Sequence, residues 1–166
     1  MHKVHGCTGS VREVRGFAGG SWVRRFGTGG APLERMGAHS FDELDAWRLA
    51  NELKLGVYRL TDSGGVIRDF RFRDQLRNSA ASAPSNIAEG FGRYEPAEFR
   101  RFLRIANGSL VETSNHLRDG VDRRHFSSKD IEELLRLATR ASAATTGLMR
   151  YLKTATSPNP RTAREP

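Results

Sequence analysis

The stretch IEELLRLATRASAATTGLMRYL, residues 131–152, decides the fold. Its apolar and small residues recur with spacings of three and four, so they would line one side of an α-helix. An unbroken alternation of these spacings is typical of helices that pack in a left-handed bundle. Ser127 or Ser128 can cap this helix, and Asp130 lies in its first turn. The predicted stripe is Ile131, Leu134, Ala138, Ala141, Thr145, Leu148 and Leu152.

Two upstream segments carry similar stripes. Ser40 or Asp42 can cap a helix that ends at the breaker cluster of residues 61–65, with Glu43 placed as in a capping box. Asp69 can cap the next helix, which we expect to end at Gly90 and Gly92. The first stripe is Ala46, Ala50, Leu53, Val57 and Leu60, and the second is Phe72, Leu76, Ser79 or Ala80, Ala83 and Ile87.

A further helix should open at Glu95 and Pro96, since proline fits the first turn, and close at Gly120. No segment alternates with period two for long enough to suggest a sheet. We therefore predict an all-α, up-down-up-down four-helix bundle over residues 40–153. The core face of this helix is Phe99, Phe102, Leu103, Ala106, Leu110, Thr113 and Leu117.

The two ends of the chain differ from this body. Residues 1–39 are rich in Gly and Arg without a sustained period, and residues 154–166 contain Pro and Thr, so we predict a disordered basic arm and a disordered tail. The arm holds +4 of the net charge of +8 and could grip phosphates. Alternatively, Met36 is the native start and the arm is a non-native extension. The body itself holds only +3.

Composition narrows the class of protein. The single cysteine, Cys7, excludes an intrachain disulfide and a cysteine metal cluster. No run approaches the ~20 apolar residues of a membrane span. We expect a cytoplasmic protein with no membrane partner and no cofactor.

The stretch SAASAPSNIAEGFGR, residues 79–93, reads as a kinked helix followed by a corner. Pro84 removes one backbone hydrogen bond, and the Asn86 side chain could satisfy the group that it frees. Glu89 could reach an arginine or the amides that follow. The polar members of this region form either a site at a bundle end or a buried network that fixes helix geometry, and we favour the network. The set is Pro84, Asn86, Glu89, Gly90, Gly108, Ser109 and Glu112.

The runs DFRFRDQLRNSAASAPSNIAEGFGR and EFRRFLRIANGSLVE resemble the 23S rRNA intervening-sequence family. FDELDAWRLANELKLGVYRLT is similar to that family's first helix, so the resemblance covers about residues 40–153. It implies a four-helix bundle that assembles as a homopentamer. It also implies kinship with the accessory variability determinant of diversity-generating retroelements, which works with a reverse transcriptase and RNA. Asn78 departs from the family pattern, in which a second arginine is usual, and this weakens a nucleic-acid role for that helix.

Clustered arginines are the best candidates for function. Arginine presents a planar fork that suits phosphate, and repetition round a ring would add the fields of equivalent side chains. The alternative is a solvated face whose arginines pair with nearby carboxylates. The candidate nucleic-acid-binding residues are Arg73, Arg77, Arg93, Arg100, Arg101 and Arg104.

The sequence offers no set of residues typical of an enzyme. Glu112 and His116 are four apart, but the repeated Glu-x-x-His pattern of a di-metal bundle is missing. His125 lies in a turn, where solvation is the simplest account. We therefore expect a non-enzymatic oligomer, without a bound metal, that associates with RNA or DNA without base specificity. The alternative is a protein-interaction scaffold that does not bind nucleic acid.

Overall fold

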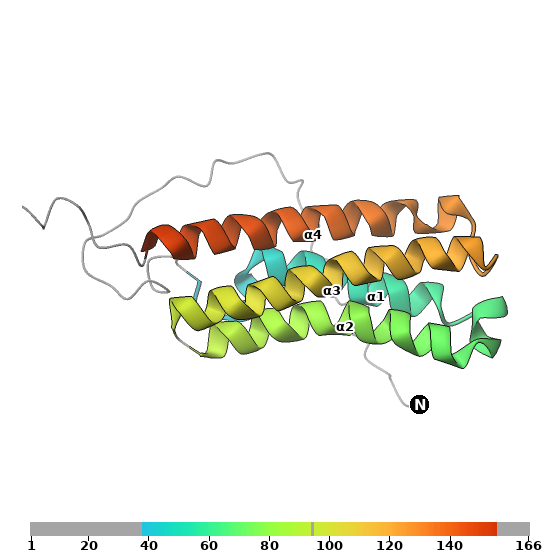
Figure 1. The fold of residues 1–166 in the computed structure, drawn as a ribbon, viewed down its shortest axis with the longest axis horizontal. Helices are drawn as coiled ribbons and strands as arrows, with labels where there is room; N and C mark the ends of the chain where they lie inside the picture. Colours follow the sequence, from blue (N-terminus) through green and yellow to red (C-terminus); the bar gives the residue numbers. More distant parts are fainter. Residues whose placement is uncertain (1–37, 94, 156–166) are drawn as a thin grey trace, which may run out of the picture.

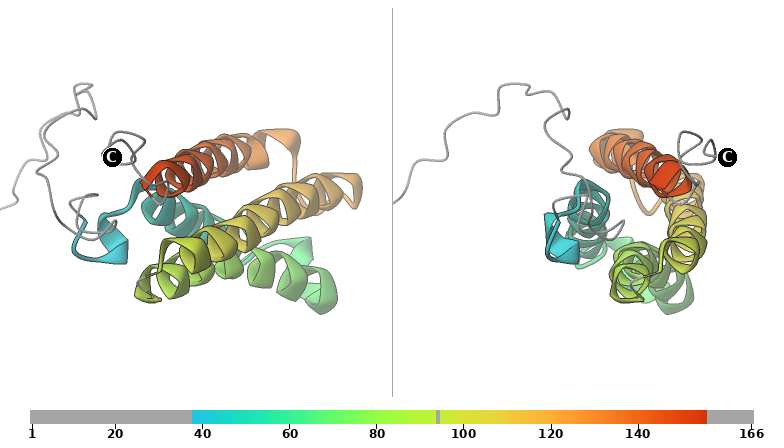
Figure 2. Two further views of the ribbon diagram at one scale, coloured as in Figure 1. Left: turned by 60° about the vertical axis from the view of Figure 1, so that its left-hand side comes forward. Right: turned by 90° about the vertical axis from the view of Figure 1, so that its left-hand side faces the viewer.

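The computed structural model describes residues 38–93 and 95–155, which form an up-down-up-down four-helix bundle (Figure 1). Viewed from the end of the bundle, the helices follow one another round a square in chain order, and each contacts the next (Figure 2). The predicted all-α bundle is confirmed. The elements are a 3-10 turn η2 (Phe41–Glu43), α1 (Asp45–Leu60), a 3-10 turn η3 (Gly65–Arg68), α2 (Phe70–Gly92), α3 (Pro96–Asp122) and α4 (Ser128–Ala155).

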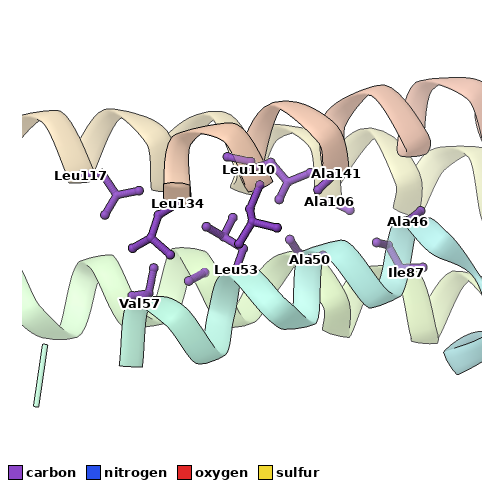
Figure 3. Packing of buried hydrophobic residues seen from close by; sticks show 14 of the residues in the cluster. Ala46, Ala50, Leu53, Val57, Ile87, Ala106, Leu110, Leu117, Leu134 and Ala141 are labelled. Atoms are coloured by element: carbon purple, nitrogen blue, oxygen red, sulfur yellow. The ribbon is translucent and has the colours of Figure 1, made fainter. Parts of the chain in front are cut away.

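The core lies along the bundle axis and draws on all four helices (Figure 3). Leu53 from α1, Leu110 from α3 and Leu134 from α4 point into the space between the helices. Leu53 and Leu110 are fully buried, and Leu134 is 8% exposed. The predicted stripes are buried almost throughout, while Leu60 and Leu148 are half-buried at the stripe edges. Burying such side chains supplies ~1.5–3 kcal/mol each, which is what drives the helices together.

The start of α1 differs from the prediction. A capping box at Ser40 is wrong, because η2 separates this serine from the helix, and Leu44 stands at the N-cap without a side-chain hydrogen bond. The Ser40 hydroxyl instead contacts the Asp42 carboxylate, and Glu43 accepts a hydrogen bond from the amide of His39 at 2.9 Å. These contacts stabilise the entry turn rather than α1.

The other predicted helix starts are confirmed. The Asp69 carboxylate accepts a hydrogen bond from the Phe72 amide at 3.2 Å, so it caps α2. Pro96 opens α3 after Glu95. At the start of α4, the Asp130 carboxylate accepts from the Ser127 amide at 2.8 Å, and the Asp130 amide donates to the Ser127 hydroxyl at 3.3 Å. This reciprocal pair is a capping box with aspartate in place of glutamate.

α2 ends at Gly92, as predicted, whereas Gly90 and Gly120 lie two residues inside the ends of α2 and α3. A Cβ on Gly90 would lie 2.7 Å from both Phe102 Cβ and Phe99 Cδ2, so its missing side chain lets α2 approach α3. A Cβ on Gly120 would lie 2.5 Å from the Phe126 ring, and α3 continues to Asp122. The positive φ in the turn that follows belongs to Arg124, at 61°.

The predicted arm and tail lie almost wholly outside the described residues. Ala38 and His39 are described at the first boundary. α4 runs to Ala155 and so includes the first two residues of the predicted tail. None of the described helices is both long enough and apolar enough to span a membrane.

Candidate nucleic-acid interface

Polar side chains between α2 and α3 form a seam of contacts. The hydroxyls of Ser79 and Thr113 lie 3.1 Å apart, and those of Ser82 and Ser109 lie 2.9 Å apart. Thr113 is fully buried and Ser109 is 7% exposed. Small hydroxyl side chains let the helices approach closely while satisfying one another's polar atoms, so the seam fixes how α2 packs on α3.

Asn86 joins this seam, although not in the predicted way. Its side-chain amide donates to the carbonyl and hydroxyl of Ser82, at 2.8 and 3.0 Å. The carbonyl freed by Pro84 is that of Ala80, six residues before Asn86, whereas a helical side chain reaches the carbonyl four residues back. The predicted satisfaction of the Pro84 gap by Asn86 is therefore wrong. α2 runs without a break past Pro84, which is buried.

The remaining members of the polar motif lie elsewhere. Gly108 is exposed and a Cβ there would meet no atom within 4 Å, so the prediction that it belongs to a buried network is wrong. Glu112 is exposed and lies 3.6 Å from the ring of His116. Glu89 pairs with Arg93 at 2.5 Å. The motif thus divides into the seam, Gly90 where α2 packs on α3, and residues such as Glu89 and Glu112 that are exposed on the surface.

The six candidate arginines are split between two ends of the bundle. Arg73 and Arg77 lie in the first half of α2, and Arg93 follows its last residue. The 16 residues from Arg77 to Arg93 correspond to about 24 Å along a helix. The first third of α3, at the same end of the bundle as Arg93, carries Arg100, Arg101 and Arg104 (Figure 1). One compact surface cannot contain all six.

Arg77 joins α2 to the end of α1. Its guanidinium donates to the Thr61 hydroxyl at 2.7 Å and to the Asp62 carboxylate at 2.6 Å, and it lies 5.5 Å from the centroid of the Tyr58 ring. Thr61 is fully buried. These contacts give Arg77 a structural role, since phosphate binding would compete with them.

Arg73 has local partners as well. It lies 3.3 Å from the Asp74 carboxylate and 5.0 Å from the centroid of the Phe70 ring. Nearby carboxylates therefore pair with both arginines, Asp74 with Arg73 and Asp62 with Arg77. Asp69 caps α2 instead.

Arg93 and Arg101 lie over the same aromatic ring. Their guanidinium carbons are 5.3 and 5.5 Å from the centroid of Phe102. Arg93 also pairs with Glu89, and Arg101 lies 3.9 Å from Glu98 at the edge of ion-pair range. Both side chains remain more than half exposed, so an incoming anion can reach them.

Arg100 and Arg104 differ from the other four candidates. Within residues 38–93 and 95–155, neither forms an ion pair with a carboxylate. They lie one turn apart on α3, with Arg104 exposed and Arg100 half-buried. An arginine without a carboxylate partner keeps its fork available for phosphate, so these two residues are the strongest of the predicted set.

The family model of the 23S rRNA-intervening sequence protein matches residues 42–147, from η2 into α4. The chain belongs to this family. The match includes the seam, the Gly90 contact and the four arginines at the α2–α3 end. No curated protein sequence matches the chain.

A polar cluster lies at the opposite end of the bundle from Arg100 and Arg104, and it was not predicted from the sequence of this intervening-sequence family member. The His125 ring nitrogen lies 3.1 Å from the Asp69 carboxylate, and Arg123 lies 3.6 Å from the same oxygen. The His125 ring also packs on Phe72 at 5.3 Å, so the predicted solvated histidine is wrong. The Phe72 amide and then His125 hold the pKa of Asp69 below its ordinary value. The only sequence signal was the capping position of Asp69.

A groove between α3 and α4 is a second feature without a sequence signal. Its volume is about 1110 Å³, and Val121, Ile131 and Leu135 contribute apolar surface. Arg136 on its rim pairs with Glu132 and Glu133. Among the described residues, no group of three His, Cys, Asp or Glu side chains could hold a metal ion. The other lining residues are Arg118, Asp122, Ser128, Lys129, Glu132, Arg136, Thr139 and Arg140.

Proposed function

We propose that this member of the 23S rRNA-intervening sequence protein family is a non-enzymatic, oligomeric bundle that associates with nucleic acid through its arginines. The observation that carries the proposal is that Arg100 and Arg104 share a face of α3 and have no carboxylate partner among the described residues. Arg93 and Arg101 extend that surface. Contacts of this kind fix position on a phosphate backbone and do not read base sequence.

Charge reversal tests this proposal. The Arg100→Glu/Arg104→Glu variant of the full chain should lose RNA and DNA affinity by more than tenfold at low salt, as measured by fluorescence anisotropy. Arg71→Glu is the matched control, because Arg71 is an exposed arginine at the other end of the bundle. If the α3 variant retains the affinity of the natural chain, the surface is not a nucleic-acid interface.

Family membership and exposed apolar side chains support assembly of several copies. Ile105 and Val111 on α3 are 42% and 61% exposed, whereas the larger side chains of Trp47 and Phe91 are half-buried. We propose a cytoplasmic homopentamer, related to the accessory variability determinant, with a reverse transcriptase as a further partner. Mass measurement by light scattering tests the pentamer, and a monomer at micromolar concentration contradicts it.

The second candidate is a protein-interaction scaffold. The ion pairs of Arg73, Arg77 and Arg93 favour it, because paired arginines contribute less to an external field. The α3–α4 groove gives such a scaffold an apolar surface to present. This alternative predicts that the purified chain binds neither RNA nor DNA in a salt-sensitive way.

A further inference from the structure

The second half of α4 carries basic residues and no acidic ones. Its carboxylates, Asp130, Glu132 and Glu133, all lie near its start, and none follows as far as Ala155. On α3, no acidic residue lies between Glu98 and Glu112. The two helices are adjacent and antiparallel, so these two acid-free stretches lie side by side (Figure 1).

The turn between the helices sets which residues are level. The groove next to the turn brings Arg118 and Val121 of α3 together with Glu132 and Leu135 of α4. Counting onward from that register at 1.5 Å per residue, Arg100 is level with about residue 153 and Arg104 with about residue 149. Arg150 therefore lies at a level between those of Arg100 and Arg104 on α3, and Arg140 lies about 15 Å from it along α4.

Arg140 and Arg150 resemble Arg100 and Arg104 in having no carboxylate partner among the described residues. Both are exposed, and neither forms an ion pair within the described ranges. Arg136, one turn before Arg140, is instead held by two glutamates. Neighbouring helix axes are ~8–10 Å apart, so the four free arginines cover a face wide enough for several phosphates.

We infer that Arg140 and Arg150 of α4 complete the nucleic-acid surface, and that its ligand is the backbone of a double helix. This inference rests on the proposed function and adds α4 to it. Proteins that hold single strands usually stack bases on exposed aromatic rings. The exposed aromatic side chains of the described residues are Phe41 and Phe70. Phe41 is in η2, which contacts α1 and α2, and Phe70 is at the start of α2, at the opposite end of the bundle, so neither lies on the face of α3 and α4. Among the residues that the structure describes, this face carries arginines and no exposed aromatic ring, which fits phosphates held rigidly in a duplex.

Salt dependence tests the role of α4. Each phosphate contact contributes ~0.9 to the slope of log affinity against log salt for a duplex. Arg140→Ala and Arg150→Ala should each flatten this slope by about one, and the double variant by about two. Arg71→Ala is the control and should leave the slope unchanged. Alanine keeps each helix intact, so circular dichroism should show no loss of helix.

The outcomes separate this inference from the proposed function. If Arg140→Ala/Arg150→Ala has the natural slope while Arg100→Ala/Arg104→Ala flattens it, α4 has no role but the proposed function stands. If neither variant changes the slope, both fail. Duplex RNA and duplex DNA should each bind more tightly than single-stranded RNA of equal length. Equal or tighter binding of the single strand overturns the assignment of a double helix.

Discussion

The close approach of α2 and α3 at Gly90 can be tested by adding one methyl group. In Gly90→Ala the new Cβ would lie 2.7 Å from Phe102 Cβ, an atom next to the backbone that cannot swing aside. Ordinary contacts of this kind begin near 3.4 Å, so the helices must separate by about 0.7 Å. Overpacking of a core costs ~1–3 kcal/mol, whereas replacing a helical glycine by alanine gains ~1 kcal/mol.

Gly108→Ala is the matched control for this experiment. Gly108 lies inside α3 and is exposed, and a Cβ there meets no atom within 4 Å. It therefore gains the same helix propensity without the overpacking. The difference in unfolding free energy between the two variants cancels the propensity gain and should equal ~1–3 kcal/mol, with Gly108→Ala the more stable. Urea unfolding followed by circular dichroism measures it. Equal stability of the two variants would refute the close approach at Gly90.

Three further predictions follow from individual contacts. Leu53→Ala should lower the unfolding free energy by ~2–5 kcal/mol, because Leu53 is fully buried at the centre of the bundle; a loss below 1 kcal/mol in urea unfolding would contradict that placement. Arg77→Met should lower the unfolding free energy by about 1 kcal/mol, because it removes the hydrogen bonds to Thr61 and Asp62, and should leave RNA affinity unchanged. Weaker RNA binding in fluorescence anisotropy would show that Arg77 belongs to the interface. The pKa of Asp69 is lowered from 3.8, so its stabilising effect is present above that pH and is lost as the pH falls below it; acid titration of Asp69→Asn should show a smaller loss than the natural chain, and identical curves would remove the effect.

The helices could be predicted from the sequence because their faces repeat with a period that leaves few alternatives. The stripe from Ile131 to Leu152 is an example, since six of its seven residues are buried and Leu148 is half-buried. The helix boundaries were harder to predict from the sequence. A serine three residues before a glutamate fits the pattern of a capping box whether or not a 3-10 turn precedes the helix, so the capping box predicted at Ser40 was wrong.

The candidate site was only partly predictable for a related reason. Periodicity places an arginine on a helix face but does not identify the carboxylate that meets it from another element. Asp62, which binds Arg77, is 15 residues away in sequence, and Asp69, which binds His125, is 56 residues away. Gly90 and Gly108 look alike as letters, yet Phe102 crowds the first and nothing within the bundle approaches the second. These distinctions depend on which helices become neighbours.

The most direct test of the central claim is the salt dependence of duplex binding by the full chain and by its Arg100→Ala/Arg104→Ala variant. Because the basic arm is present in both proteins, the comparison isolates the face of the bundle. The account predicts that the slope of log affinity against log salt becomes flatter by about two in the variant. Two identical slopes would contradict it.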